Sequence, residues 1–279
     1  MDHFFNNPEE IVTASIKASC RKASLSTDRM ILLGMLAGAF IAFGGATSST
    51  AAHGIVDVGI ARTLAGVIFP VGLMMVVFLG AELFTGNCLM IMAVWEKQIS
   101  WKQMLRNLII VYFSNLAGAL LITALVVCSG NLNYSGGLLG AYTIKVAVAK
   151  ISVSPIQGIV SGILCNILVC TAILMCVAAK EVVGKIFAIF FPILAFVVGG
   201  FEHSIANMFY IPAGIMAALN PNYIAKAQEV YEITSEQLNR LNIWGSLYNF
   251  IPVTIGNIIG GMLFVGFPLY YVYKKNAHA

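Results

Sequence analysis

Two short stretches decide how this chain folds: Gly80–Asn87, which reads GAELFTGN, and Gly200–Asn207, which reads GFEHSIAN. Both read glycine, any residue, glutamate, any three residues, a small residue and asparagine, and both follow a Phe-Pro pair in a long apolar segment. Glycine and a carboxylate are poor occupants of an apolar helix, so each stretch predicts an interruption. Because the two stretches match, they predict a chain made of two related halves.

The composition places these interruptions in a membrane. Of 279 residues, 59% are apolar and 10% are charged, and the mean hydropathy is +0.88. Soluble domains carry about 25% charged residues, so this chain lacks the surface of a water-soluble globule. No segment shows the alternating pattern of barrel strands, which predicts an all-α membrane protein. The net charge of +4 forms no basic stripe, so we expect no nucleic-acid partner.

Charged residues divide the chain into six predicted membrane crossings. The stretches 30–56, 107–144, 151–179 and 241–273 contain no Asp, Glu, Lys or Arg, while 63–95 and 186–225 contain one each, Glu82 and Glu202. Each stretch exceeds the roughly 20 residues that a helix needs to cross the hydrocarbon. The crossings are predicted at about 30–53, 62–95, 105–129, 152–178, 186–220 and 247–273, the second and fifth being interrupted.

Further matches pair the crossings of the two halves in order. The third reads Asn107-x7-Asn115-x2-Gly118 and the sixth reads Asn249-x7-Asn257-x2-Gly260, while Gly34-x3-Gly38 in the first resembles Gly158-x3-Gly162 in the fourth. Three crossings per half is an odd number, so the halves have opposite orientation. We expect two inverted repeats, at about 30–129 and 152–273, with a transport site where their broken helices meet.

Cationic residues predict the orientation in the membrane. Eleven of the 16 Lys and Arg residues lie on the side that holds both ends of the chain, which predicts cytoplasmic termini in a bacterial-type inner membrane. We expect an N-terminal cytoplasmic region at 1–29 with an amphipathic helix over 8–26, a channel domain at 30–275 and a cytoplasmic tail at 276–279. Residues 220–243 are expected to form an outer loop with some helix. No cleaved signal is expected at the N-terminus.

Three ionisable side chains, Glu82, Glu202 and His203, lie deep within the predicted crossings. Such residues are costly in a bilayer and mark pathways or support irregular backbone. For the two glutamates we favour acceptance of hydrogen bonds from freed backbone N–H groups, with proton handling as the alternative. His203 has no counterpart, because the first half carries Leu83 at its position, and Thr85 brings a hydroxyl to the opposing break. Together His203 and Thr85 are candidates to bind one small anion or its acid.

Other residues have two interpretations each. Lys150 stands at the outer mouth of the fourth crossing, where it either attracts anions or extends its ammonium group to the membrane–water interface. Asn166 lies sixteen residues further along, which corresponds to about 24 Å if the helix is continuous from Lys150. Large apolar residues flank the breaks, either as dry constrictions or as packing: Phe69, Leu73, Leu83, Phe84 and Phe196. The six cysteines have no CxxC spacing and are expected to be reduced packing residues.

The stretches GFEHSIANMF at 200–209 and GAELFT at 80–85 resemble the signature segments of the formate/nitrite transporter family, and the resemblance covers about residues 8–275. It implies an aquaporin-like protomer in a homopentamer, with a gating loop after Thr85. It further implies a central polar pair, Thr85 and His203, a chamber residue, Asn166, a vestibule lysine, Lys150, and Glu202 beside the histidine. The implied constriction consists of Phe69, Leu73, Leu83, Phe84, Val169 and Phe196. The matched positions Glu82, Asn87 and Asn207 are expected to support the breaks.

These observations predict a passive, pH-dependent channel for formate, or for formic acid with a linked proton. Nitrite, hydrosulfide and short monocarboxylates are the alternative cargoes, and a sodium-driven transporter is a further alternative. A haem-bearing redox subunit would need two facing histidines, and His203 is the one histidine well inside a predicted crossing. We therefore expect no enzyme activity, cofactor or metal.

Overall fold

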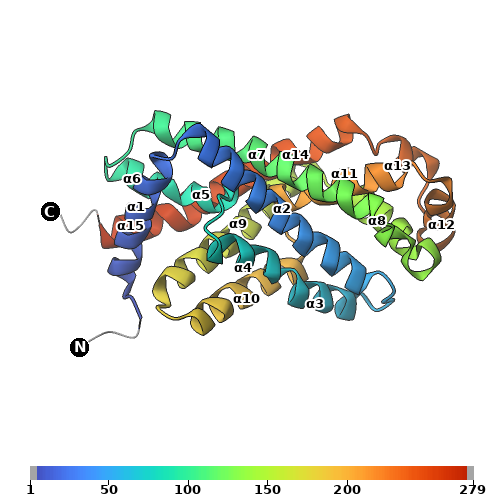
Figure 1. The fold of residues 1–279 in the computed structure, drawn as a ribbon, viewed down its shortest axis with the longest axis horizontal. Coiled ribbons are helices and arrows are strands. Elements are labelled where there is room, and N and C mark those ends of the chain that lie inside the picture. Colours follow the sequence, from blue (N-terminus) through green and yellow to red (C-terminus); the bar gives the residue numbers. More distant parts are fainter. Residues whose placement is uncertain (1–4, 275–279) are drawn as a thin grey trace.

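The computed structural model describes residues 5–274, which form helices and contain no named strand; the predicted tail 276–279 lies outside the described residues (Figure 1). Six helices are long and apolar enough to cross a membrane. They are α2 (Thr27–Ala52), α3 with α4 (Val58–Ile68 and Pro70–Phe78), α7 (Trp101–Cys128), α9 (Pro155–Ala178), α10 (Val182–Gly199), and α14 to α15 (Ile243–Ile259 and Phe267–Tyr273) joined by a π-helical segment, η3 (Gly260–Gly266). The all-helical, multi-pass prediction is therefore confirmed.

The remaining helices complete the fold. They are α1 (Pro8–Ala23), α5 (Phe84–Asn87), η1 (Cys88–Met90), α6 (Ile91–Trp95), η2 (Asn131–Asn133), α8 (Tyr134–Ile151), α11 (Ser204–Ala217), α12 (Pro221–Tyr231) and α13 (Ser235–Asn239). Figure 1 shows α1, α5, α6 and α15 at one end of the molecule and α8, α12 and α13 at the other. The helices α12 and α13 lie in the predicted helix-containing loop.

Both interruptions occur at the stretches that the sequence marks. Helix α4 ends at Phe78 and α5 begins at Phe84, while α10 ends at Gly199 and α11 begins at Ser204. Gly80 and Gly200 have φ values of 67° and 69°, in the left-handed region that favours glycine. The backbone groups released by each break need partners, because lipid supplies none.

Two buried asparagines supply those partners. Asn115 Nδ2 donates to the carbonyls of Gly34 (2.8 Å) and Glu82 (2.9 Å), and its Oδ1 accepts from Phe84 N–H (3.0 Å). In the second half, Asn257 donates to the carbonyls of Gly162 (2.8 Å) and Glu202 (3.0 Å) and accepts from Ser204 N–H (2.9 Å). The same three bonds in each half show that the breaks are built alike.

These bonds correct the predicted register between the first and fourth crossings. Gly34 matches Gly162, one helical turn beyond the predicted partner Gly158, and Asn166 therefore takes the position of Gly38. Glycines spaced by four recur on one helix face at every turn, so a match based on this spacing slips easily by one turn.

The structure also places a helix where no crossing was predicted. Helix α8 ends at Ile151, and α9 begins at Pro155 after the N-cap Ser154. Lys150 therefore lies on α8, so the separation of about 24 Å that a continuous helix would give does not apply to Lys150 and Asn166. The same arrangement precedes the first crossing, where α1 carries Lys22 and is followed by the N-cap Ser26 of α2.

Candidate functional site

His203 and Thr85 meet in the interior of the protein, where the two breaks come together. His203 is the N-cap of α11 and its Nδ1 accepts a hydrogen bond from Ala206 N–H at 3.1 Å, while Nε2 lies 2.9 Å from Thr85 Oγ1. A neutral imidazole whose Nδ1 accepts carries its proton on Nε2, so Nε2–H donates to the Thr85 oxygen. The hydroxyl hydrogen of Thr85 is then available to another acceptor. Both side chains are buried, at 3% and 0% exposure.

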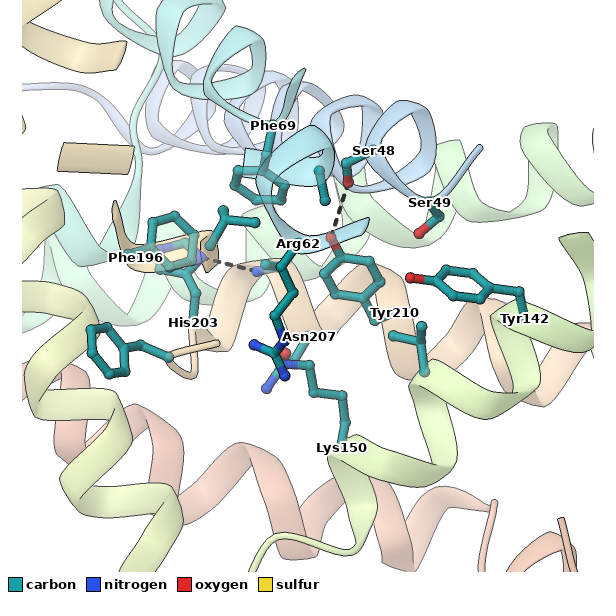
Figure 2. Close-up of a pocket in the computed structure, with 15 residues that line it drawn as sticks. Ser48, Ser49, Arg62, Phe69, Tyr142, Lys150, Phe196, His203, Asn207 and Tyr210 are labelled. Atoms are coloured by element: carbon teal, nitrogen blue, oxygen red, sulfur yellow. Dashed lines mark hydrogen bonds between the residues drawn. The ribbon is translucent and has the colours of Figure 1, made fainter. Parts of the chain in front are cut away.

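An aromatic pair covers one side of His203. The rings of Phe69 and Phe196 pack edge to face with centroids 5.4 Å apart, and Phe196 lies 6.0 Å from the imidazole. Beyond them is a cavity of about 160 Å³ whose lining includes Phe69, Phe196, His203 and Lys150 (Figure 2). An adjoining cavity of about 430 Å³ shares Lys150 in its lining. We call these two cavities together the Lys150 vestibule.

Lys150 is held by an ion pair in this vestibule. Its Nζ lies 2.6 Å from Glu202 Oε1, and Asn207 donates to Glu202 Oε2 at 2.7 Å. Asn249 accepts from Asn207 at 2.7 Å and donates to the Lys150 carbonyl at 2.9 Å. The buried carboxylate is thus compensated by a cation and an amide.

The first half contains the same network around Lys22. Lys22 Nζ lies 2.7 Å from Glu82 Oε1, and Asn87 donates to Glu82 Oε2 at 2.7 Å and to Asn107 Oδ1 at 2.8 Å. Lys22, Glu82, Asn87 and Leu83 line a cavity of about 440 Å³, the Lys22 vestibule. Sequence reasoning missed Lys22. The available signal was that Lys22 and Lys150 both stand four residues before the serine that precedes a crossing.

The two glutamates do not accept hydrogen bonds from the freed backbone N–H groups, so the favoured interpretation was wrong about their partners. Their carboxylates bind lysine and asparagine side chains, and the freed backbone groups bind the amides of Asn115 and Asn257. The division has a chemical reason. An amide both donates and accepts, so it satisfies a carbonyl and an N–H together, whereas a carboxylate only accepts and is stabilised by a cation.

Asn166 holds the opposing break in place. Its Nδ2 donates to the carbonyls of Thr85 (3.2 Å) and Asn257 (2.6 Å), and Cys170 Sγ donates to the same Thr85 carbonyl at 3.5 Å. Asn166 is fully buried and does not line either vestibule. The geometry makes it a positioning residue for Thr85, the hydroxyl partner of His203.

Three of the predicted constriction residues line a vestibule, and the other three are buried outside the linings. Leu83 lines the Lys22 vestibule, while Phe69 and Phe196 line the Lys150 vestibule. Leu73, Phe84 and Val169 are buried and line neither. The two vestibules share no lining residue, so buried side chains separate them at the level of Thr85 and His203.

Within residues 5–274, no group of three or more His, Cys, Asp or Glu residues is arranged to hold a metal ion. The six cysteines are free in the structure.

The protein has six crossings, two of which are broken, and a polar pair between two vestibules that each contain a lysine. These features define a membrane transport protein built from two matched halves. The model of the formate/nitrite transporter family matches residues 9–271, and the chain belongs to that family. This confirms the resemblance noted in the sequence.

Individual relatives match over almost their whole length. The formate channel FocA of Escherichia coli (strain K12) is 35% identical over 277 residues, which cover 97% of this chain and 96% of that protein. The formate channel BtFdhC of Bacillus thuringiensis is 37% identical over 278 residues, 97% of each. A solved structure described as a pentameric formate channel with formate bound has a TM-score of 0.79 at 31% identity and covers 89% of this chain and 98% of that one.

Proposed function

We propose that this protein is a passive, pH-dependent channel that moves formate, or formic acid with a linked proton, across a bacterial cytoplasmic membrane. The observation that carries the proposal is the His203–Thr85 pair, buried between two vestibules that each hold a lysine. The protein acts without chemical conversion of its substrate and without a cofactor. The formate channels among its relatives support this choice of substrate.

The same proposal includes the arrangement in the membrane. Residues 1–29 form the cytoplasmic N-terminal region with α1, residues 30–275 form the channel domain, and 276–279 form a cytoplasmic tail. The distribution of Lys and Arg supports cytoplasmic termini, with the Lys22 vestibule facing the cytoplasm and the Lys150 vestibule facing outward. The pentameric assembly of the similar solved channel supports a homopentamer with one pathway in each protomer.

Permeation depends on balancing the charge of a dehydrated anion. Transfer of a carboxylate into a medium of low dielectric constant costs far more than a channel can tolerate without compensation. Each vestibule lysine keeps an ammonium N–H donor for an arriving anion beside its bond to glutamate, and the pair Phe69–Phe196 admits the substrate without its hydration shell. Beyond the rings, the Thr85 hydroxyl hydrogen is the donor available to a carboxyl group, because the His203 Nε2–H already donates to Thr85.

Two forms of the substrate satisfy this requirement. Either a protonated His203 balances formate, or a proton passes to the substrate and neutral formic acid crosses. Protonation of His203 occurs at Nδ1 and therefore breaks its bond to Ala206 N–H. Both routes carry a proton dependence, so formate flux rises as the pH falls.

A flux panel tests the proposal. The purified protein is reconstituted in proteoliposomes, and fluxes of formate, nitrite and hydrosulfide are measured at two pH values, with and without a sodium gradient. We expect formate to equilibrate fastest, without accumulation against its gradient and without a sodium requirement. Faster nitrite or hydrosulfide flux at both pH values would assign the alternative cargo, and accumulation that depends on sodium would exclude a passive channel.

A further inference from the structure

Arg62 brings a guanidinium group into the Lys150 vestibule. It lies on α3 and lines both cavities of the vestibule, and Figure 2 shows its side chain reaching into the space between Phe196 and Lys150. Its Nη1 donates to the Val198 carbonyl at 3.4 Å, a long bond at the end of α10. Within residues 5–274 the ion pairs are Lys22–Glu82 and Lys150–Glu202, so Arg62 has no carboxylate partner there.

The other two cations of the vestibule are already occupied. Lys150 is paired with Glu202 at 2.6 Å. Lys145 lies over two aromatic rings, with its Nζ 4.6 Å from the Tyr231 centroid and 5.6 Å from the Tyr142 centroid. Lys145 and Arg62 therefore both keep a positive charge without a carboxylate partner, and of these two Arg62 is the one that also lines the cavity beside His203.

The break in the second half makes room for this side chain. Gly80 and Gly200 have the same left-handed conformation, yet a Cβ at Gly80 would meet nothing within 4 Å, whereas a Cβ at Gly200 would collide with the Arg62 guanidinium. The spacing that relates Glu82 to Glu202 places Val182 opposite Arg62 in the repeat. The arginine therefore has no cationic counterpart, and the repeat architecture does not account for it.

An open acceptor lies in the same cavity. Asn207 is buried, and its Oδ1 has no hydrogen-bond partner among residues 5–274. The matching oxygen of Asn87 accepts from Lys22 Nζ at 3.0 Å. The Lys150 vestibule thus has unpaired guanidinium donors and, in its buried wall, an acceptor without a partner, while the corresponding oxygen of the Lys22 vestibule is filled.

We propose that Arg62 is the entrance binding residue for planar oxyanions and that it favours formate over anions with one heavy atom, such as chloride or hydrosulfide. A guanidinium presents five N–H donors in a planar fork, which binds two oxygens of one carboxylate together. The bond to Val198 uses one of these donors. An anion with one acceptor atom cannot offer the fork two oxygens in this way. This inference rests on the proposed function and names the group that selects the substrate at the mouth.

Chemical labelling of the wild-type protein tests occupancy of the site without measuring transport. Phenylglyoxal condenses with guanidinium groups, and mass spectrometry of the peptides gives the labelling rate at each arginine. We expect saturating formate to slow labelling of Arg62 about threefold or more, with no effect of equal chloride and no effect at exposed Arg240, which lines neither cavity. An unchanged rate at Arg62 would overturn the inference and leave Arg62 as a cap of α10.

Flux measurements separate charge from shape. Arg62→Lys keeps the charge without the fork, and Arg62→Gln removes both, with Arg240→Gln as the matched control. For formate added on the Lys150 side, we expect the half-saturating concentration to rise about three- to fivefold in both Arg62 variants, and hydrosulfide flux to fall only in Arg62→Gln. Equal effects of Arg62→Lys on both substrates would contradict selection by shape. A wild-type protein in which formate protects Arg62 from labelling but which does not transport formate would instead reject the proposed function. The binding role of Arg62 would then still stand.

Discussion

The claim that each break is held by one asparagine leads to a paired mutational prediction. In Asn115→Ala, the Glu82 carbonyl and the Phe84 N–H lose their side-chain partner in a fully buried position; the third partner, Gly34, lies within α2. A buried backbone group left without a partner costs about 1–3 kcal/mol. Two such groups give an expected loss of about 2–6 kcal/mol in the free energy of unfolding.

The second half provides the matched variant. Asn257→Ala frees the Glu202 carbonyl and the Ser204 N–H, which are bonded at 3.0 and 2.9 Å. Because the two asparagines do the same work, we expect the two losses to agree within about 1 kcal/mol. Asn222→Ala, at an exposed position on α12, serves as the control and is expected to change stability by less than about 0.5 kcal/mol.

The assay is titration of the purified protein in mixed micelles with sodium dodecyl sulfate, followed by helical circular dichroism. The midpoint and slope of each curve give the free energy of unfolding. If either variant behaves like Asn222→Ala, the amide does not hold the break. If the two losses in the free energy of unfolding differ by more than about 2 kcal/mol, the two asparagines do not contribute equally to stability. The matched hydrogen bonds would then not reflect matched energies.

Three further predictions concern the vestibules and the turns. Lys22→Met leaves the buried Glu82 carboxylate unpaired and is expected to cost about 3–5 kcal/mol in the same titration, most of it restored by adding Glu82→Gln; lack of rescue would contradict the pairing. Gly200→Ala should lower the melting temperature more than Gly80→Ala. Both variants strain a left-handed turn, but only Gly200→Ala also displaces Arg62. Equal decreases in the melting temperature would argue against the contact between Gly200 and Arg62. Phe196→Ala should raise the acetate-to-formate flux ratio severalfold by opening the aromatic pair, and an unchanged ratio would remove the ring from selection.

The breaks and the central pair could be predicted from sequence because a polar group in an apolar crossing is costly and therefore visible. Glu82, Glu202 and His203 stand out against long uncharged stretches, and their matched positions expose the repeat. The asymmetry between His203 and Leu83 identified the imidazole, and the structure places it against Thr85, as expected for the pair.

The partners of these groups could not be predicted in the same way. Lys22 lies 60 residues before Glu82 and outside the predicted crossings, so its one sequence signal is the spacing to a serine that it shares with Lys150, and this spacing does not name Glu82 as the partner. Asn115 and Asn257 were recognised as repeat markers, but the direction of an amide side chain depends on tertiary packing. Helix α8 was missed because Lys145 and Lys150 make its apolar sequence resemble a polar connection.

The most direct test of the account is formate flux across pH in proteoliposomes for His203→Leu, which gives the second half the residue of the first. The account predicts that flux falls at least about tenfold, the effect of one lost hydrogen bond worth roughly 1.4 kcal/mol, and that the remaining flux no longer depends on pH in the wild-type manner. A variant with the wild-type rate and the wild-type pH profile would show that permeation does not use the imidazole.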